Sequence, residues 1–193
     1  MPPTLALKYS FQLASALRYL HEDARVVHRD VKLENCVIDR EDGDLRLCDF
    51  GLADFLPGDD TPSPRNQFVT PKSNVSDTHH IRPEDMVAGG SLAYAAPEQI
   101  CSTTPLLDTA IDMWSYGVVV HALTIGELPF HDPFAPKLQM MVTKGDWNKD
   151  RFAARVDPEI CEVVINCLMM DRHRRWTASQ VLNSQWILSL DSC

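Results

Sequence analysis

The spacing of apolar positions near the start of the chain predicts an amphipathic helix. Between Thr4 and His21, apolar residues recur every three or four positions: Leu5, Tyr9, Leu13, Ala16, Leu17 and Leu20. A helix turns once every 3.6 residues, so this spacing places them on one face. Thr4 stands before the series and carries a hydroxyl that can accept a backbone hydrogen bond. We therefore expect Thr4 to cap the helix.

Two short apolar runs further along the chain predict a β-hairpin. They comprise residues 36–38 and 45–48, and the polar segment 39–44 that separates them contains Asp42-Gly43. Asp-Gly is favoured in tight hairpin turns because glycine adopts positive φ angles without steric cost. The two runs should therefore pair as short antiparallel strands.

The second half of the chain predicts further helices. Residues 111–125 are apolar nearly all round, which is typical of a helix that is buried on every side. Helical periodicity also marks 136–144, 157–170 and 177–188, and the last segment should turn inward Ala178, Val181, Leu182 and Trp186. By contrast, residues 57–82 have no apolar period and predict a mobile loop. The expected fold is mainly α with a small antiparallel β-hairpin.

Composition and charge narrow the class of protein. The 193 residues carry 18 Lys and Arg against 27 Asp and Glu, a net charge of −9, which argues against a nucleic-acid or anionic-membrane partner. The length suits one domain. The six cysteines are scattered, with no Cys-x-x-Cys pair, and no apolar stretch is long enough to span a membrane. These features favour a soluble protein of the cytoplasm or nucleus, and they leave the oligomeric state open.

Polar residues that suit phosphoryl transfer flank the predicted hairpin. Asp30, Lys32 and Asn35 precede its first strand, and Asp49 directly follows its second. A hairpin of this length brings Asn35 and Asp49 to the same end of the strand pair. Oxygen ligands for Mg²⁺, a cation for phosphate and a carboxylate for an incoming hydroxyl would then converge.

At this point the sequence resembles the eukaryotic serine/threonine protein kinases, and specifically their C-terminal lobe. The resemblance covers nearly the whole chain. It rests on the order and spacing of His28-Arg29-Asp30 with Lys32 and Asn35, Asp49-Phe50-Gly51, Ala96-Pro97-Glu98, the run Asp112–Gly117, and Arg175. Each short motif is common by chance, but their occurrence together in this order is specific.

The resemblance implies roles at the catalytic centre. Asp30 would be the catalytic base, Lys32 would neutralise the transferring phosphoryl group, and Asn35 with Asp49 would bind Mg²⁺ beside ATP. Val37 would form the floor under adenine. Glu34 is a candidate contact for ATP or for a basic substrate residue. The implied cofactors are ATP and Mg²⁺, and the implied partners are protein substrates with Ser or Thr hydroxyls.

Other matched positions imply structural or regulatory roles. His28 and Phe50 would pack in the hydrophobic spine, with Gly51 completing their motif, and Ser91 would bond to the catalytic Asp and Lys. Asp112 is costly to bury unpaired, so it should hold backbone amides of the catalytic loop. Glu98 and Arg175 would form a buried ion pair. Arg29 would meet a negative charge on the activation segment, which the resemblance places at residues 49–98. These expectations concern residues of this sequence: His28, Arg29, Phe50, Gly51, Ser91, Glu98, Asp112 and Arg175.

The family's motifs that precede the catalytic loop do not occur in the 193 residues. Missing are the glycine-rich loop, the strand lysine and the helix glutamate. We therefore expect residues 1–193 to be a partial kinase domain, either part of a longer kinase or an independent lobe. The alternative to an enzyme is a non-catalytic, kinase-like binding or regulatory fragment. For control, Glu84 or Asp85 would supply a built-in carboxylate for Arg29, and phosphorylation of Thr61 or Ser63 would tune partner binding.

Overall fold

Helices form most of the chain in the computed structural model, which describes residues 1–57, 91–103 and 106–192. The expected insert at 57–82 therefore lies outside the described residues beyond Pro57, as do Thr61, Ser63, Glu84 and Asp85. The α-helices are α1 (Pro3–Arg18), α3 (Pro97–Cys101), α4 (Thr109–Ile125), α5 (Ala135–Lys144), α6 (Lys149–Ala153), α7 (Pro158–Cys167), α8 (Ala178–Leu182) and α9 (Gln185–Leu188). Shorter helical turns are η1 (Tyr19–Asp23), η2 (Leu33–Asn35), η4 (Ser91–Ala93) and η5 (Ser189–Ser192). A mainly helical fold is thus confirmed.

The first helix follows its predicted pattern with two differences. Helix α1 buries Leu13 and Leu17, but Leu5 at its exposed start keeps 38% of its surface accessible. Thr4 is not the cap, because the helix begins one residue earlier, at Pro3, and Pro2 occupies the cap position without a side-chain hydrogen bond. Proline suits the first turn of a helix, since its fixed φ is already helical and the amide that it lacks would have no partner there.

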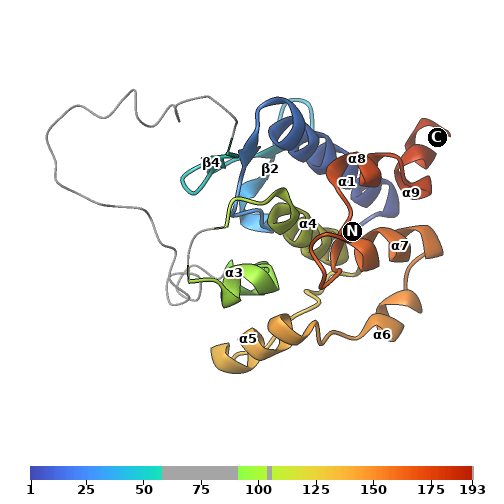
Figure 1. Cartoon of the computed structure of the whole chain (residues 1–193). Helices are drawn as coiled ribbons and strands as arrows, with labels where there is room; N and C mark the ends of the chain where they lie inside the picture. Colours follow the sequence, from blue (N-terminus) through green and yellow to red (C-terminus); the bar gives the residue numbers. More distant parts are fainter. Residues whose placement is uncertain (58–90, 104–105, 193) are drawn as a thin grey trace, which may run out of the picture.

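Helix α4 is the central element of the molecule (Figure 1). Asp108 caps its start by accepting a hydrogen bond from the backbone nitrogen of Ala110 at 2.9 Å, and Gly126 ends it with a φ of 79°. Residues on all its sides are buried, as the sequence predicts, and they include Trp114, Tyr116 and Val119. Helices α1 and α7 pack against it, and close contact with α7 is possible because Gly117 has no side chain there.

The described residues form two small antiparallel sheets at one end of the helical body. Strands β2 (Cys36–Ile38) and β3 (Leu45–Leu47) form the predicted hairpin, with Cys36 opposite Leu47. The second sheet, of β1 (Val26–Val27) and β4 (Asp54–Phe55), was not predicted from the sequence. Its strands have two residues each, too few for an alternating pattern to be recognised.

The predicted C-terminal helix is interrupted. Instead of one helix over 177–188, α8 ends before Asn183 and α9 starts after Ser184, whose hydroxyl accepts a hydrogen bond from the backbone nitrogen of Ile187. Serine is a common cap because its oxygen satisfies an amide that has no helical partner. Ala178, Val181 and Trp186 are buried as expected, whereas Leu182 is only partly buried.

Candidate active site

Three predicted site residues converge in the segment before the hairpin. Lys32 Nζ donates to Asp30 Oδ2 over 2.7 Å. Asn35 Nδ2 donates to the same carboxylate oxygen at 3.0 Å and to the backbone oxygen of Asp30 at 2.7 Å. The side chains of Asp30 and Lys32 are only 11% and 14% exposed. Asp30 is therefore held in one orientation by two neighbours that sequence spacing alone had associated with it.

The hairpin brings Asp49 to the same end of the strand pair as Asn35. The backbone nitrogen of Cys48, next to Asp49, donates to the backbone oxygen of Asn35 at 2.9 Å. Asp49 has a φ of 62°, a conformation that few residues other than glycine adopt, and its Oδ1 accepts a hydrogen bond from Gly51 N at 3.2 Å. A side chain at Gly51 would meet that oxygen at 3.2 Å, so glycine fits this tight turn.

The side-chain oxygens of Asn35 and Asp49 suit a hard divalent cation such as Mg²⁺ that is also bound by phosphate oxygens. Oδ1 of Asn35 and Oδ2 of Asp49 have no hydrogen-bond donor among the described residues, so both oxygens are available as ligands. One amide and one carboxylate oxygen are ligands that Mg²⁺ accepts, although it usually retains waters or phosphates as well. The described part of the chain contains no cluster of three or more His, Cys, Asp or Glu residues that could hold a metal ion alone.

Asp112 of α4 binds the backbone of the catalytic loop, the segment of residues 28–35 that carries Asp30. Its Oδ2 accepts a hydrogen bond from the backbone nitrogen of His28, and its Oδ1 accepts one from that of Arg29, both at 2.8 Å. The residue is 1% exposed, which makes these bonds necessary for its burial. The geometry agrees with the predicted contact between Asp112 and backbone amides. It holds the loop immediately before Asp30.

His21 is a part of this anchor that the sequence did not reveal. Its Nε2 lies 2.8 Å from Asp112 Oδ2, and the residue is 6% exposed. His21 belongs to η1, the wide turn that extends α1, and its backbone position places the ring under the loop. The one signal in the sequence was a polar residue at the end of an apolar helix face, which is usually a solvated position.

His28 packs against Phe50 and links the loop to the hairpin. The two rings meet edge to face with centroids 4.8 Å apart. His28 Nε2 donates to the backbone oxygen of Cys48 at 3.1 Å, and its Nδ1 accepts from the backbone nitrogen of Asp30 at 3.3 Å. These partners require a neutral imidazole with its proton on Nε2. His28 is therefore a packing and orienting residue in this geometry, as the sequence suggested.

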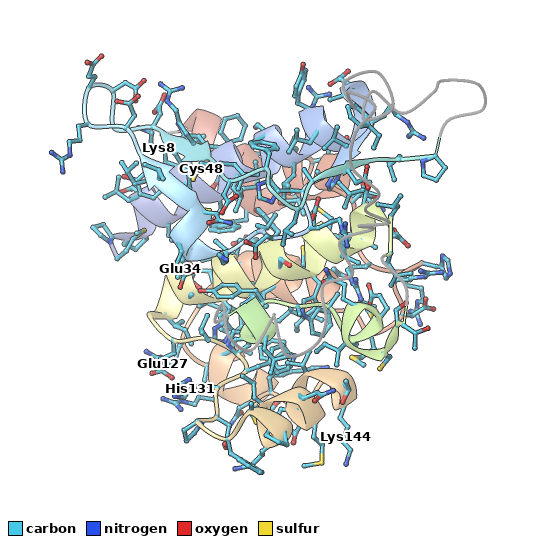
Figure 2. All side chains as sticks on the ribbon, turned by 90° about the vertical axis from the view of Figure 1, so that its left-hand side faces the viewer. Lys8, Glu34, Cys48, Glu127, His131 and Lys144 are labelled. Carbon is cyan, nitrogen blue, oxygen red and sulfur yellow. The ribbon has the colours of Figure 1, made fainter. Side chains whose placement is uncertain are left out.

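Glu34, Val37 and Cys36 lie around the base of the hairpin. Glu34 is exposed at the boundary between the hairpin and α4 (Figure 2). Burial raises the pKa of the Tyr94 phenol to about 12, with the negative charge of Glu34 adding to the effect. Burial likewise raises the pKa of Cys36 to about 12, so this residue is a thiol rather than a thiolate at neutral pH. Val37 remains 49% exposed, as an apolar floor for a ligand would be.

Arg29 and Ser91 are two further residues that the sequence associates with the site. Arg29 adopts a φ of 71°, and its Nη1 donates to the backbone oxygen of Leu52 at 3.3 Å. It thus contacts the chain shortly after Asp49. Ser91 begins η4, but its side chain and the carboxylates expected to meet Arg29, Glu84 and Asp85, lie outside the described residues. These pairings stay predictions.

Glu98 and Arg175 form the expected ion pair. Arg175 Nη1 and Nη2 reach the two carboxylate oxygens of Glu98 at 2.5 and 3.1 Å. The guanidinium also donates to the backbone oxygens of Ala110 and Met169, and it lies 5.1 Å from the centre of the Trp114 ring. The Arg175 side chain is fully buried and the Glu98 side chain is 17% exposed. The pair ties α3 to the start of α4 and to the loop before α8.

Comparison with known proteins agrees with this geometry. The chain is 29% identical to the serine/threonine-protein kinase ppk25 of Schizosaccharomyces pombe over 98% of its length, and 38% of that relative is covered. It is 32% identical to a probable KIN1 homologue of Encephalitozoon cuniculi, over 93% of this chain and 27% of the relative. It is 31% identical to the maternal embryonic leucine zipper kinase of Xenopus laevis, over 94% and 24% respectively.

The matches cover nearly all of this chain but only part of each relative. The chain spans about two fifths or less of the length of these relatives. A family model described as the protein kinase domain matches residues 1–187 of the 193. No helix among the described residues is long and apolar enough to cross a membrane. The chain therefore belongs to the protein kinase domain family.

Proposed function

We propose that residues 1–193 supply the catalytic and substrate-binding lobe of a protein serine/threonine kinase. The observation that carries this proposal is the arrangement of Asp30 with Lys32 and Asn35 around one carboxylate oxygen, at 2.7 and 3.0 Å. A solvated loop aspartate would not be held by two such neighbours while nine-tenths buried. Kinship with named serine/threonine kinases and a lysine at position 32 support the choice of Ser and Thr hydroxyls.

The residues of this chain would divide the reaction between them. The Asp30 carboxylate accepts the proton of a Ser or Thr hydroxyl while that oxygen forms a bond to the γ-phosphorus of ATP and the bond to ADP breaks. Lys32 donates to the phosphoryl oxygens as charge develops on them. Asn35 and Asp49 would hold Mg²⁺, which supplies charge neutralisation at the phosphates. Asp112 keeps Asp30 in place through the backbone of the preceding residues.

Replacement of Asp30 tests the proposal directly. In the full-length protein, Asp30→Asn keeps the shape of the side chain and removes the carboxylate. We expect phosphate transfer from ATP to a peptide to slow by about 10²- to 10⁴-fold, the usual contribution of a general base. The matched control is Asp39→Asn, since Asp39 lies on the hairpin turn and pairs with Arg46. Undiminished transfer by Asp30→Asn would refute the assignment.

A second candidate function is a non-catalytic binding module. The exposed apolar side chains of Val37, Ile38 and Phe50 favour it, because they offer a surface for another protein or segment. Phosphate-transfer assays of the unchanged protein, Asp30→Asn and Asp39→Asn separate the two functions. A binding module would retain its partner and show no phosphate transfer with either Asp30→Asn or the unchanged protein. A kinase would lose phosphate transfer with Asp30→Asn and keep it in the unchanged protein and in Asp39→Asn.

A further inference from the structure

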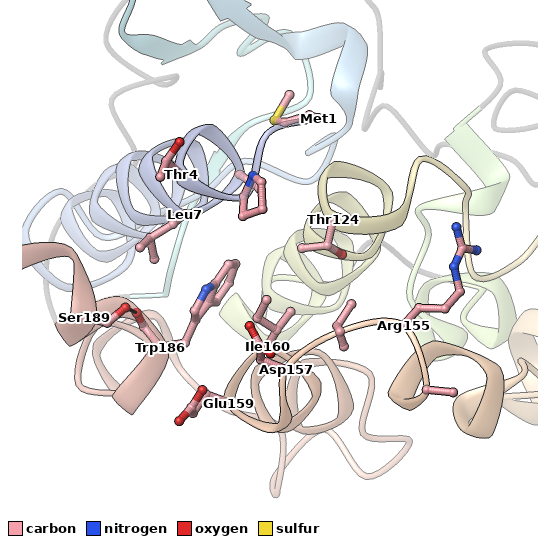
Figure 3. Close-up of a pocket in the computed structure, with 14 residues that line it drawn as sticks. Met1, Thr4, Leu7, Thr124, Arg155, Asp157, Glu159, Ile160, Trp186 and Ser189 are labelled. Atoms are coloured by element: carbon pink, nitrogen blue, oxygen red, sulfur yellow. Dashed lines mark hydrogen bonds between the residues drawn. The ribbon is translucent and has the colours of Figure 1, made fainter. Parts of the chain in front are cut away.

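A cavity of about 530 Å³ lies among four helices of the molecule. It is bounded by the start of α1, the end of α4, the loop before α7, the start of α7 and α9. Figure 3 shows the Trp186 indole standing between α1 and α7 within this space. The volume lies within the range of about 300–1,000 Å³ that small-molecule sites occupy. None of the residues assigned to the catalytic centre lines the cavity.

The inner wall of the cavity is apolar and aromatic. Leu7 from α1, Ile160 from α7 and the Trp186 ring line it, and each is less than 10% exposed. Apart from the indole N–H of Trp186, these side chains offer no hydrogen-bonding group, but they can cover an aliphatic or aromatic body. The face of a tryptophan ring also attracts a cation that lies within about 6 Å of it.

The rim of the cavity carries two carboxylates that the fold does not use. Asp157 and Glu159 line the opening, are exposed, and form no ion pair with any described residue. Asp157 precedes α7 without capping it through its side chain. The one arginine of the lining, Arg155, is already bound to Glu127 at 3.1 Å and to the backbone oxygen of Ile125. In Figure 3 its guanidinium points away from Trp186.

The starts of α1 and α7 do not make this an anion site. Both helices begin with proline, Pro3 and Pro158, which has no amide hydrogen to donate. The amides of Leu5 and Ala6 are engaged with the backbone oxygen of Pro2. The start of α1 therefore offers few donors to a phosphate or carboxylate, and the two rim carboxylates would repel such an anion.

We propose that this cavity binds a small organic cation, namely an amine with an aliphatic or aromatic body. The body would lie against Leu7, Ile160 and Trp186. The ammonium group would lie at the rim between the indole face and the carboxylates of Asp157 and Glu159. The site is separate from the proposed catalytic centre, so its occupancy can be measured without any assay of phosphate transfer.

Three probes that share one body and differ only in charge test the proposal. They are 4-phenylbutylamine, 4-phenylbutan-1-ol and 4-phenylbutyrate, each titrated into the protein while the indole N–H resonances are followed by NMR. We expect the amine to shift Trp186 and to bind about 5-fold tighter than the alcohol and at least 10-fold tighter than the acid. Trp114 and Trp147 are buried elsewhere and serve as internal references.

Variants of the rim identify the source of the preference. Asp157→Asn combined with Glu159→Gln keeps the shape and should lower the affinity for the amine about 5-fold while leaving that for the alcohol unchanged. Glu162→Gln, an exposed carboxylate of α7 that does not line the cavity, is the matched control. If the double variant fails to fold, the unchanged protein is titrated at rising ionic strength, where only the binding of the amine should weaken.

Several outcomes would overturn the proposal. Equal affinity for the three probes would show an apolar cavity without charge preference, and tightest binding of 4-phenylbutyrate would show the opposite preference. Shifts at other tryptophans without a shift at Trp186 would place the amine elsewhere. Absence of any shift at Trp186 up to about 10 mM amine would show that the cavity does not take this class of ligand.

Discussion

Asp112 connects the buried helix α4 to the loop that carries Asp30, and it does so through a single carboxylate. Three donors converge on it: the backbone nitrogens of His28 and Arg29, and His21 Nε2, each at 2.8 Å. A buried donor left without an acceptor costs about 1–3 kcal/mol. The carboxylate therefore stabilises the loop mainly by preventing this cost, and its removal affects stability as well as the geometry of the site.

We expect Asp112→Ala to lower the free energy of unfolding by about 2–5 kcal/mol, because the donors of His28 and Arg29 lose their acceptor in the protein interior. Urea denaturation followed by circular dichroism measures the change. Asp112→Asn keeps one acceptor oxygen, so its free energy of unfolding should lie between those of Asp112→Ala and the unchanged protein. A loss below about 1 kcal/mol for Asp112→Ala would mean that water replaces the carboxylate and that the anchor is dispensable.

The Glu98–Arg175 pair should show strong coupling between its members. Removal of Glu98 leaves the Arg175 guanidinium buried without its counter-charge, so Glu98→Ala should cost about 3–5 kcal/mol. Arg175→Met removes the charge itself. In the double variant Glu98→Ala with Arg175→Met, the second change should cost much less than it does alone. A double-mutant cycle of unfolding free energies measures the coupling, and strictly additive losses would contradict it.

At the scale of elements, an aromatic cluster joins α4 to the chain that follows it. His121 of α4 stacks on Phe152 of α6 with centroids 4.5 Å apart, and it meets Trp147 edge to face. His121 Nδ1 donates to the backbone oxygen of Glu127 at 2.7 Å. Burial is the main influence on this ring, and it lowers the pKa of His121 below its usual 6.5.

The lowered pKa of His121 predicts a loss of stability in mild acid. Between the folded-state pKa and about 6.5, the unfolded chain binds more protons than the folded one, so stability rises with pH there. The free energy of unfolding should therefore fall as the pH drops below about 6.5. His121→Gln, which keeps a donor but does not titrate, should flatten this dependence. Exposed His173→Gln is the control, and parallel profiles for His121→Gln and the unchanged protein would contradict the prediction.

The contact between α4 and α7 depends on the missing side chain of Gly117. A Cβ built there would lie 2.8 Å from the Cβ of Cys167 and 3.1 Å from Cδ2 of Leu168. Gly117→Ala should therefore destabilise the fold by about 1–3 kcal/mol, despite the higher helix propensity of alanine. Thermal unfolding measures the loss. Stabilisation by Gly117→Ala would show that α7 can move away at little cost.

The pattern of the sequence predicts those elements whose periodicity extends over several turns. Helix α4 and the β2–β3 hairpin appear where expected, because a continuous apolar run and an Asp-Gly turn are strong local signals. The break at Asn183 and Ser184 was missed because apolar spacing continues across it. The partnership of His21 with Asp112 spans 91 positions, a contact that no local pattern encodes.

At the scale of the whole molecule, the described part of the chain leaves the surface beside the proposed catalytic groups open to solvent. Asn35 is buried and the Asp30 side chain is 11% exposed, yet Val37 and Phe50 are 49% and 48% exposed. The described residues therefore place a half-exposed apolar surface beside the proposed catalytic groups. An open surface buries less of a nucleotide base than an enclosed one would, so the apolar contribution to ATP binding is reduced.

The charges around the proposed site also predict weak binding of ATP. Lys32 is the cation of the proposed site, and its ammonium group is already bonded to Asp30 at 2.7 Å. The four phosphate charges of ATP would approach Asp30 and Asp49 in a chain whose net charge is −9. Mg²⁺ offsets part of this repulsion, but Asn35 and Asp49 provide only two ligands for it. Both the apolar and the electrostatic contributions to nucleotide binding are therefore small.

We accordingly expect the 193-residue chain alone to bind Mg²⁺-ATP with a dissociation constant above about 1 mM, weaker than about −4 kcal/mol. Isothermal titration calorimetry with and without Mg²⁺ measures it. Asp49→Asn is the matched variant, because weak binding that depends on the ion should weaken further when this carboxylate is lost. Micromolar binding by the unchanged chain would contradict the expectation. It would mean that one apolar face and two metal ligands hold the nucleotide, and that the lobe can act without further protein around its phosphates.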